Sequence, residues 1–169
     1  GFWAFPNDVA FHSTGDFFAL DTGNNRLQRL RHPDLSFRAV FDLPTGSGPG
    51  DVDGPRGLAI DDQDRIIISD TLNDRILVCE LINFEQDLDC TPFGSSGSAP
   101  GKFNRPIGVD VDALGRIWIA DSMNHRIQVC DDAGNCTAFG EFGDFEVTSD
   151  TAEGDNSEGP GRFNTPHDV

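Results

Sequence analysis

One twelve-residue segment occurs three times in this chain, and this repetition limits the fold more than any other feature. The copies read ALDTGNNRLQRL (19–30), ISDTLNDRILVC (68–79) and IADSMNHRIQVC (119–130), 49 and 51 residues apart. A second marker precedes each copy, FPNDVAF (5–11), GPRGLAI (54–60) and RPIGVDV (105–111), and TPHDV (165–169) starts the pattern again. Repeats of this length are typical of propellers and solenoids, in which each repeat is one supersecondary unit.

Apolar residues within each unit alternate with a period of two rather than 3.6, which indicates β-strands. In the third unit, the segments IGVDVDA, RIWIAD, RIQVCD and CTAFG are separated by turn residues. We therefore predict that each unit is a four-stranded antiparallel meander. A ring of such sheets covers both faces of each sheet and protects its edges, so the sequence favours an all-β propeller.

The repeats divide the chain into predicted blades. Blade 1 with its linker spans 1–54, blade 2 spans 55–105, blade 3 with an acidic insertion spans 106–165, and 166–169 begin a fourth blade. No apolar run approaches the roughly 18 to 20 residues of a membrane span. The first residues, GFWAFPND, have no basic region or cleavage pattern, so we expect any secretion signal to be removed or to lie outside this sequence.

Residues 103–140 resemble an NHL repeat, with a Pro-x-Gly-Val start, an Asp at the end of the second strand and Asn-x-Arg-Ile opening the third. The resemblance covers nearly the whole chain, although the first copy is looser in its third and fourth strands. It implies a β-propeller, and propellers of this family are commonly six-bladed. The chain would then supply three blades and the start of a fourth, which is a partial propeller.

Three polar residues recur in every unit. A carboxylate at the end of a strand can accept hydrogen bonds from turn amides or pair with the arginine that follows, and an asparagine suits a turn position with positive φ. Because every unit carries them, we assign these residues a structural role. They are Asp21, Asn24 and Arg26, then Asp70, Asn73 and Arg75, then Asp121, Asn124 and Arg126.

Positions that differ between units are the candidates for function. The first strand of a propeller blade lines the central channel, so the two residues after each marker proline should surround one mouth of it. The first of these positions holds Asn7, Arg56, Ile107 and His167, and the second holds Asp8, Gly57, Gly108 and Asp168.

His167 has a sharper interpretation. The segment NTPHDV resembles the Pro-His motif of the NHL-type peptidyl-hydroxyglycine amidating lyases, which implies a zinc ligand. A three-histidine site needs partners, however, and this chain offers Asn7, Arg56 and Ile107 at the comparable positions. A channel-lining or turn histidine is the alternative.

The four cysteines flank the same junction in two blades. Cys79 and Cys90 lie on either side of the turn between strands three and four of blade 2, and Cys130 and Cys136 do so in blade 3. Antiparallel neighbours lie close enough to bridge, and only this pairing repeats the blade geometry, so we predict disulfides Cys79–Cys90 and Cys130–Cys136. Free buried cysteines are the alternative. Disulfides need an oxidising compartment, and Asn135 in NCT is a candidate glycosylation acceptor.

Charge argues against one class of partner. A formal net charge of −17 would repel phosphate backbones, so we do not expect nucleic-acid binding. Oxygen-rich loops could hold calcium, but no EF-hand register is present, and a solvated acidic loop is the alternative. The acidic side chains of the insertion are Asp144, Glu146, Asp150, Glu153, Asp155 and Glu158.

The sequence favours a binding module over an enzyme, because the common hydrolase and phosphate-loop motifs do not occur in it. We interpret the chain as an extracellular or secreted NHL-type propeller, or part of one, that binds a protein or glycan through its inter-blade loops and channel mouth. One alternative is a metal-dependent lyase or hydrolase in which His167 and Arg56 contribute and zinc or calcium is bound. Another is a self-assembling polymer, since three blades leave two open edges for a second copy or for further blades of a longer chain.

Overall fold

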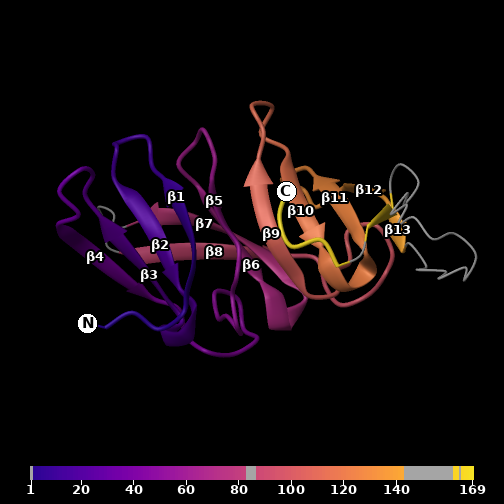
Figure 1. Ribbon diagram of the computed structural model, residues 1–169, viewed down its shortest axis with the longest axis horizontal. Helices are drawn as coiled ribbons and strands as arrows, with labels where there is room; N and C mark the ends of the chain where they lie inside the picture. The colour runs from indigo at the N-terminus through magenta and orange to yellow at the C-terminus, as the bar shows by residue number, and fades with distance from the viewer. Residues whose placement is uncertain (1, 83–86, 143–161, 164) are drawn as a thin grey trace, which may run out of the picture.

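The computed structural model describes residues 2–82, 87–142, 162–163 and 165–169 (Figure 1). The described residues form three four-stranded antiparallel sheets, each with its strands in chain order, and contain no α-helix. The three sheets follow one another along the molecule in Figure 1. The predicted all-β fold of meander blades is therefore confirmed. No helix among the described residues has the length and hydropathy needed to span a membrane.

The strands match the sequence repeats. Blade 1 comprises β1 (Pro6–Phe11), β2 (Phe17–Asp21), β3 (Arg26–Leu30) and β4 (Phe37–Asp42). Blade 2 comprises β5 (Leu58–Ile60), β6 (Ile66–Asp70), β7 (Arg75–Ile82) and β8 (Asp87–Phe93). Blade 3 comprises β9 (Pro106–Val111), β10 (Ile117–Asp121), β11 (Arg126–Cys130) and β12 (Cys136–Phe139). A short parallel pair, β13 (Glu141–Phe142) and β14 (Arg162–Phe163), follows blade 3.

The core lies between the blades. Ile66 and Ile68 point to the side of blade 1 and belong to one buried cluster, whereas Ile67 points to blade 3 and belongs to a second. Successive residues of a strand face opposite sides of the sheet, so a strand between two neighbours needs apolar residues on both. The run of three isoleucines in β6, all at most 1% exposed, follows from that position.

The prediction of positive φ at Asn24, Asn73 and Asn124 is wrong. Each of these residues lies in a 3₁₀ turn, namely Thr22–Asn24, Thr71–Asn73 or Ser122–Asn124. The left-handed conformation falls on the next residue, with φ of 45° at Asn25, 53° at Asp74 and 54° at His125. The recurring asparagine is needed for its side-chain amide, which bonds to the carboxylate described below.

Candidate functional site at the channel mouth

A buried aspartate at the end of the second strand holds each blade together. In blade 3, Asp121 is 0% exposed, and its Oδ1 accepts a hydrogen bond of 2.8 Å from the backbone N–H of Asn104. Its Oδ2 accepts from Asn124 at 2.9 Å, from Arg126 Nε at 2.7 Å and from Gln128 at 2.9 Å. Four donors converge on one carboxylate, which offsets the cost of burying its charge.

The same arrangement occurs in the other two blades. Asp21 accepts from the Ala4 amide at 2.7 Å, and Asp70 accepts from the Asp53 amide at the same distance. Each carboxylate also accepts from the Asn and Arg that follow it, namely Asn24, Arg26, Asn73 and Arg75. Burial raises the pKa of Asp21, but these hydrogen bonds outweigh burial, and the net pKa lies below its usual value. The geometry supports the structural role assigned to all nine residues.

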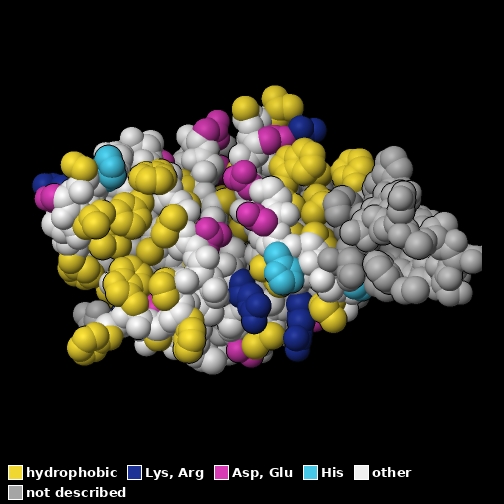
Figure 2. Space-filling view, in the orientation of Figure 1, with side chains coloured by type: hydrophobic (Ala, Val, Ile, Leu, Met, Phe, Trp, Pro, Cys, Tyr) yellow, Lys and Arg dark blue, Asp and Glu magenta, His cyan; other side chains and the backbone are white. Residues whose placement is uncertain are grey.

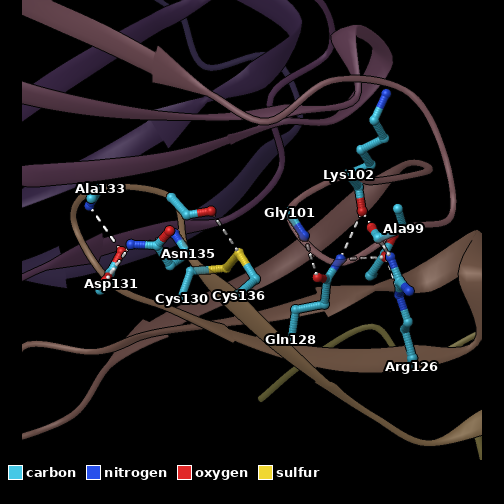
Figure 3. The surroundings of a disulfide bond; sticks show 12 residues. Ala99, Gly101, Lys102, Arg126, Gln128, Cys130, Asp131, Ala133, Asn135 and Cys136 are labelled. Atoms are coloured by element: carbon cyan, nitrogen blue, oxygen red, sulfur yellow. Dashed lines mark hydrogen bonds and ion pairs between the residues drawn. A yellow bond between two sulfur atoms is a disulfide. The ribbon is translucent and has the colours of Figure 1, made fainter.

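The arginine of each set also fixes the linker that enters its blade. Arg126 donates to the carbonyl of Ser98 at 2.6 Å. It also donates to the carbonyls of Ala99 at 3.0 Å and Lys102 at 2.8 Å (Figure 3). In blade 2, Arg75 binds the carbonyls of the 46–54 loop in the same way. This loop is one of the inter-blade loops, for which the sequence predicts ligand binding, and Arg75 ties its backbone to blade 2.

A second repeated contact joins neighbouring blades, and sequence reasoning missed it. The hydroxyl that follows each aspartate donates to the carbonyl of the next marker proline. Thr22 reaches Pro55 at 2.7 Å and Thr71 reaches Pro106 at 2.8 Å. Ser122 makes the same bond to Pro166. The signal in the sequence was a Thr or Ser after every repeated Asp. Because this bond holds the proline, it also fixes the position of the residue after the proline, which lines the pocket described next.

The structure brings all of the predicted mouth residues together. They line one pocket of about 290 Å³. In Figure 2, acidic, basic and histidine side chains gather near the middle of the displayed face. The lining residues are Asn7, Asp8, Arg56, Gly57, Ile107, Gly108, His167 and Asp168.

The two glycines of the pocket are explained by the close approach of neighbouring first strands. A Cβ atom on Gly57 would lie 2.2 Å from the carbonyl oxygen of Ile107. A Cβ atom on Gly108 would lie 2.7 Å from the carbonyl oxygen of His167. Real Cβ atoms do not approach backbone oxygens so closely, so side chains are excluded at these positions.

The pocket contains charges of both signs. Arg56 and His167 are exposed, and Asn7 donates to Thr22 Oγ1 at 2.9 Å. Asp8 accepts from the backbone N–H of Leu58 in blade 2 at 2.8 Å. Burial raises the pKa of Asp8 most. Backbone hydrogen bonds oppose that rise and the nearby carboxylates Asp110 and Asp168 add to it, so the net pKa lies above its usual value.

The described residues do not fit a three-histidine zinc centre. Around His167 the pocket offers Asn7, Arg56 and Ile107, and the guanidinium of Arg56 repels a metal cation. Among the described parts of the chain, no group of three or more His, Cys, Asp or Glu residues is placed to hold a metal ion. The acidic side chains proposed for calcium, from Asp144 to Glu158, lie outside the described residues.

The structure joins Cys79 to Cys90 and Cys130 to Cys136, and these are all four cysteines of the chain. The two cysteines of each pair are direct partners in the strand register, β7 with β8 and β11 with β12. Asn135 lies exposed in the turn beside the second disulfide, and its side-chain amide donates to Asp131 at 2.9 Å (Figure 3).

A larger cavity of about 670 Å³ lies at the outer rim between blades 1 and 2. Phe41 and Leu43 in its wall belong to the buried core, and Asp51 already accepts a bond of 2.9 Å from the Gly48 amide. The smaller mouth pocket is the better candidate site, because its side chains occupy equivalent positions in successive repeats and differ between blades.

Comparison with known proteins identifies the repeat. Residues 103–130 match the family model of the NHL repeat. The mouse protein named NHL repeat-containing protein 3 is 40% identical over 88 residues, which cover 52% of this chain and 25% of the mouse protein. The human protein of the same name gives the same identity and coverage. The chain thus matches about a quarter of the length of these relatives.

Solved structures with a similar fold are more distant in sequence. The virginiamycin B lyase of Staphylococcus aureus, crystallised with quinupristin, has a TM-score of 0.58 at 19% identity over 79% of this chain and 40% of the lyase. A structural genomics protein of unknown function from Bacteroides thetaiotaomicron has a TM-score of 0.62 at 17% identity, over 95% of this chain and 40% of that protein. At these identities the likeness concerns the fold alone.

Proposed function

We propose that the channel mouth binds a protein in an oxidising, extracellular compartment, because residues 103–130 match the NHL repeat and such repeats commonly serve as protein-interaction modules. The mouth is defined by the eight pocket residues given above. A glycan is the alternative ligand for the same surface.

One observation carries this proposal. The hydrogen bonds around the buried aspartate and the bond from the next hydroxyl to the proline are the same in all three blades. The residue after the marker proline, in contrast, is Asn7, Arg56, Ile107 or His167. The same hydrogen-bond network therefore holds a different side chain in each blade. Side chains that differ between blades can distinguish ligands, whereas the repeated network cannot.

The charge of the mouth supports a ligand with a carboxylate opposite Arg56. Arg56 is exposed and forms no ion pair with the described residues, in a chain of net charge −17. A guanidinium binds a carboxylate through two parallel hydrogen bonds, and arginine is enriched at protein interfaces. Asp8 and Asp168 then offer acceptors for a basic or amide group of the same ligand.

The two disulfides support the proposed compartment. Structural disulfides persist in oxidising environments and are rare in the cytosol. The exposed position of Asn135 in a glycosylation acceptor sequence agrees with that assignment.

The test is a search for ligands among secreted proteins with the immobilised, non-reduced chain, followed by affinity measurement on single variants. Arg56→Ala should weaken binding of the ligand about tenfold or more, because arginines at interface centres contribute disproportionately. Arg31→Ala, an exposed arginine in the turn between β3 and β4, is the matched control and should change affinity less than twofold. Equal binding by Arg56→Ala, His167→Ala and the parent chain would refute the proposal.

The enzyme alternative predicts something different. A channel-centred metal lyase or hydrolase should retain zinc or calcium in a fixed ratio to protein after desalting, and His167→Ala should abolish both metal retention and turnover. A binding module should pass through desalting without a fixed metal content. Elemental analysis of the parent and His167→Ala separates the two functions.

A further inference from the structure

A second pocket, of about 340 Å³, lies beside the mouth pocket and is formed by residues of blade 1 and of the strand and loop that begin blade 2. We call it the side pocket. Asn7 and Arg56 line both pockets, so Arg56 borders the mouth on one side and the side pocket on the other. The lining residues of the side pocket are Phe5, Asn7, Thr22, Gly23, Gly54, Arg56 and Leu72.

Two exposed apolar side chains form walls of the side pocket. Phe5 is 81% exposed and Leu72 is 47% exposed, and each lies over a glycine. A Cβ atom on Gly23 would lie 3.0 Å from a carbon of the Phe5 ring, and a Cβ atom on Gly54 would lie 3.0 Å from a methyl carbon of Leu72. The pocket therefore offers apolar surface next to the exposed guanidinium of Arg56.

The side pocket results from side chains that differ between blades on a backbone that does not. The residue after the repeated hydroxyl is Gly23, Leu72 or Met123, and its N–H donates to a carbonyl two residues before the marker proline in every blade, at 2.7 to 3.0 Å. The side chain at this position is absent in blade 1 and apolar in blades 2 and 3. The side pocket thus varies between blades in the same way as the mouth.

Hydrogen bonds fix the polar end of the side pocket. Asn7 donates to Thr22 Oγ1 at 2.9 Å, and Thr22 donates in turn to the carbonyl of Pro55 at 2.7 Å. The backbone N–H of the next residue, Arg56, donates to the carbonyl of Ser69 at 3.1 Å. The backbone of Arg56 is therefore held in place before a ligand arrives, which lowers the entropy cost of binding.

We propose that the two pockets together bind a short exposed segment of a protein in which an acidic residue has an apolar residue on one side and a basic residue on the other. The acidic side chain pairs with Arg56, and the apolar side chain enters the side pocket. The basic side chain enters the mouth, toward Asp8 and Asp168. This inference rests on the proposed function and specifies its ligand.

The arrangement of charges favours an acidic residue within a chain over a free C-terminus. Arg56 has apolar walls beside it in one pocket and two carboxylates beside it in the other. A chain that continues in both directions from its carboxylate can use both pockets, whereas a chain that ends there can use only one. The volume of the side pocket is near the lower end of the roughly 300 to 1,000 Å³ of small-ligand pockets, which suits one side chain rather than a folded element.

The probes are two heptapeptides with acetylated and amidated ends, Gly-Ser-Leu-Glu-Lys-Ser-Gly and the peptide with its three central residues reversed. The two orders cover both chain directions, and the blocked ends remove the terminal charges. Fluorescence anisotropy of labelled peptides, titrated with the non-reduced chain, measures affinity. We expect one order to bind with a dissociation constant below about 1 mM. Replacing its leucine by serine, its glutamate by glutamine or its lysine by serine should each weaken binding about tenfold.

Leu72→Ser tests the side pocket separately from the mouth. It should weaken binding of the leucine peptide about tenfold and leave binding of the serine-substituted peptide unchanged, because only the first peptide contacts this wall. Met123→Ser is the matched control. Met123 is 46% exposed at the same position of blade 3 and lines neither pocket, so affinity should change less than twofold. Equal urea midpoints of the two variants and the parent show that all three are folded.

Three results would overturn the inference. They are no binding of either peptide order below about 1 mM, an equal effect of Leu72→Ser on the leucine and serine peptides, and tighter binding of Gly-Ser-Gly-Ser-Gly-Ser-Leu with a free carboxylate than of both blocked peptides. The proposed function would survive each of them if Arg56→Ala still weakened binding of a secreted protein ligand. It would fail with the inference only if Arg56→Ala and His167→Ala left that binding unchanged.

Discussion

Replacing Asp121 with asparagine keeps the shape of the side chain but puts a hydrogen-bond donor where three other donors converge. Asn124, Arg126 and Gln128 all donate to Oδ2, at 2.7 to 2.9 Å, and an amide nitrogen can accept none of these bonds. The site is closed to bulk solvent, since the Asp121 side chain is 0% exposed and the Arg126 side chain is 10% exposed. Arg126 keeps its bonds to linker carbonyls, so we expect a loss of about 3 kcal/mol, the lower end for a broken buried ion pair.

Urea unfolding of the non-reduced chain, followed by tryptophan fluorescence, measures this loss as a change in the free energy of unfolding. Asp132→Asn is the control. Asp132 bonds to Arg65 at 2.9 and 3.0 Å, but it is half exposed, so its loss should cost at most about 1 kcal/mol. If Asp121→Asn costs no more than Asp132→Asn, the buried carboxylate does not hold the blade as the geometry indicates.

Serine at both Cys130 and Cys136 should lower the free energy of unfolding by about 2 kcal/mol, because this disulfide closes a loop with a sequence separation of only 6, and urea midpoints without reductant measure the change. The hydrogen bonds that lower the pKa of Asp21 stabilise the folded chain above about pH 4, and this stability is lost as pH falls through the folded pKa. Asp21→Asn should therefore flatten the acid limb of a stability titration, and an unchanged slope would contradict this role. Gly57→Ala should cost about 1 to 3 kcal/mol, because its Cβ would lie 2.2 Å from the Ile107 carbonyl oxygen, and an unchanged thermal midpoint would exclude the close strand approach.

Features that depend on repetition could be predicted from the sequence. The period of the pattern fixes which strands are equivalent, and the alternation of apolar residues identifies the strands themselves. The residues of the mouth pocket could be predicted from the repeat period and the strand positions together, because Asn7, Arg56, Ile107 and His167 hold one position in successive units. The disulfide between Cys130 and Cys136 could likewise be predicted from the register of one hairpin.

Features that depend on how one blade sits on the next could not be predicted. The bond from Thr71 to Pro106 joins residues 35 positions apart, and no local pattern connects a hydroxyl with that carbonyl. The role of Asn124 was misjudged for a related reason. Asparagine is common at left-handed turn positions, and only the folded turn shows that its amide faces Asp121 while His125 takes the positive φ.

The bond from Thr22, Thr71 or Ser122 to the proline carbonyl of the next blade has a consequence for symmetry. It is the same bond at all three junctions among the described residues, so each sheet is tied to the next segment at an equivalent point. Because each tie is local, removal of one hydroxyl should loosen one junction and leave the sheets on either side of it intact.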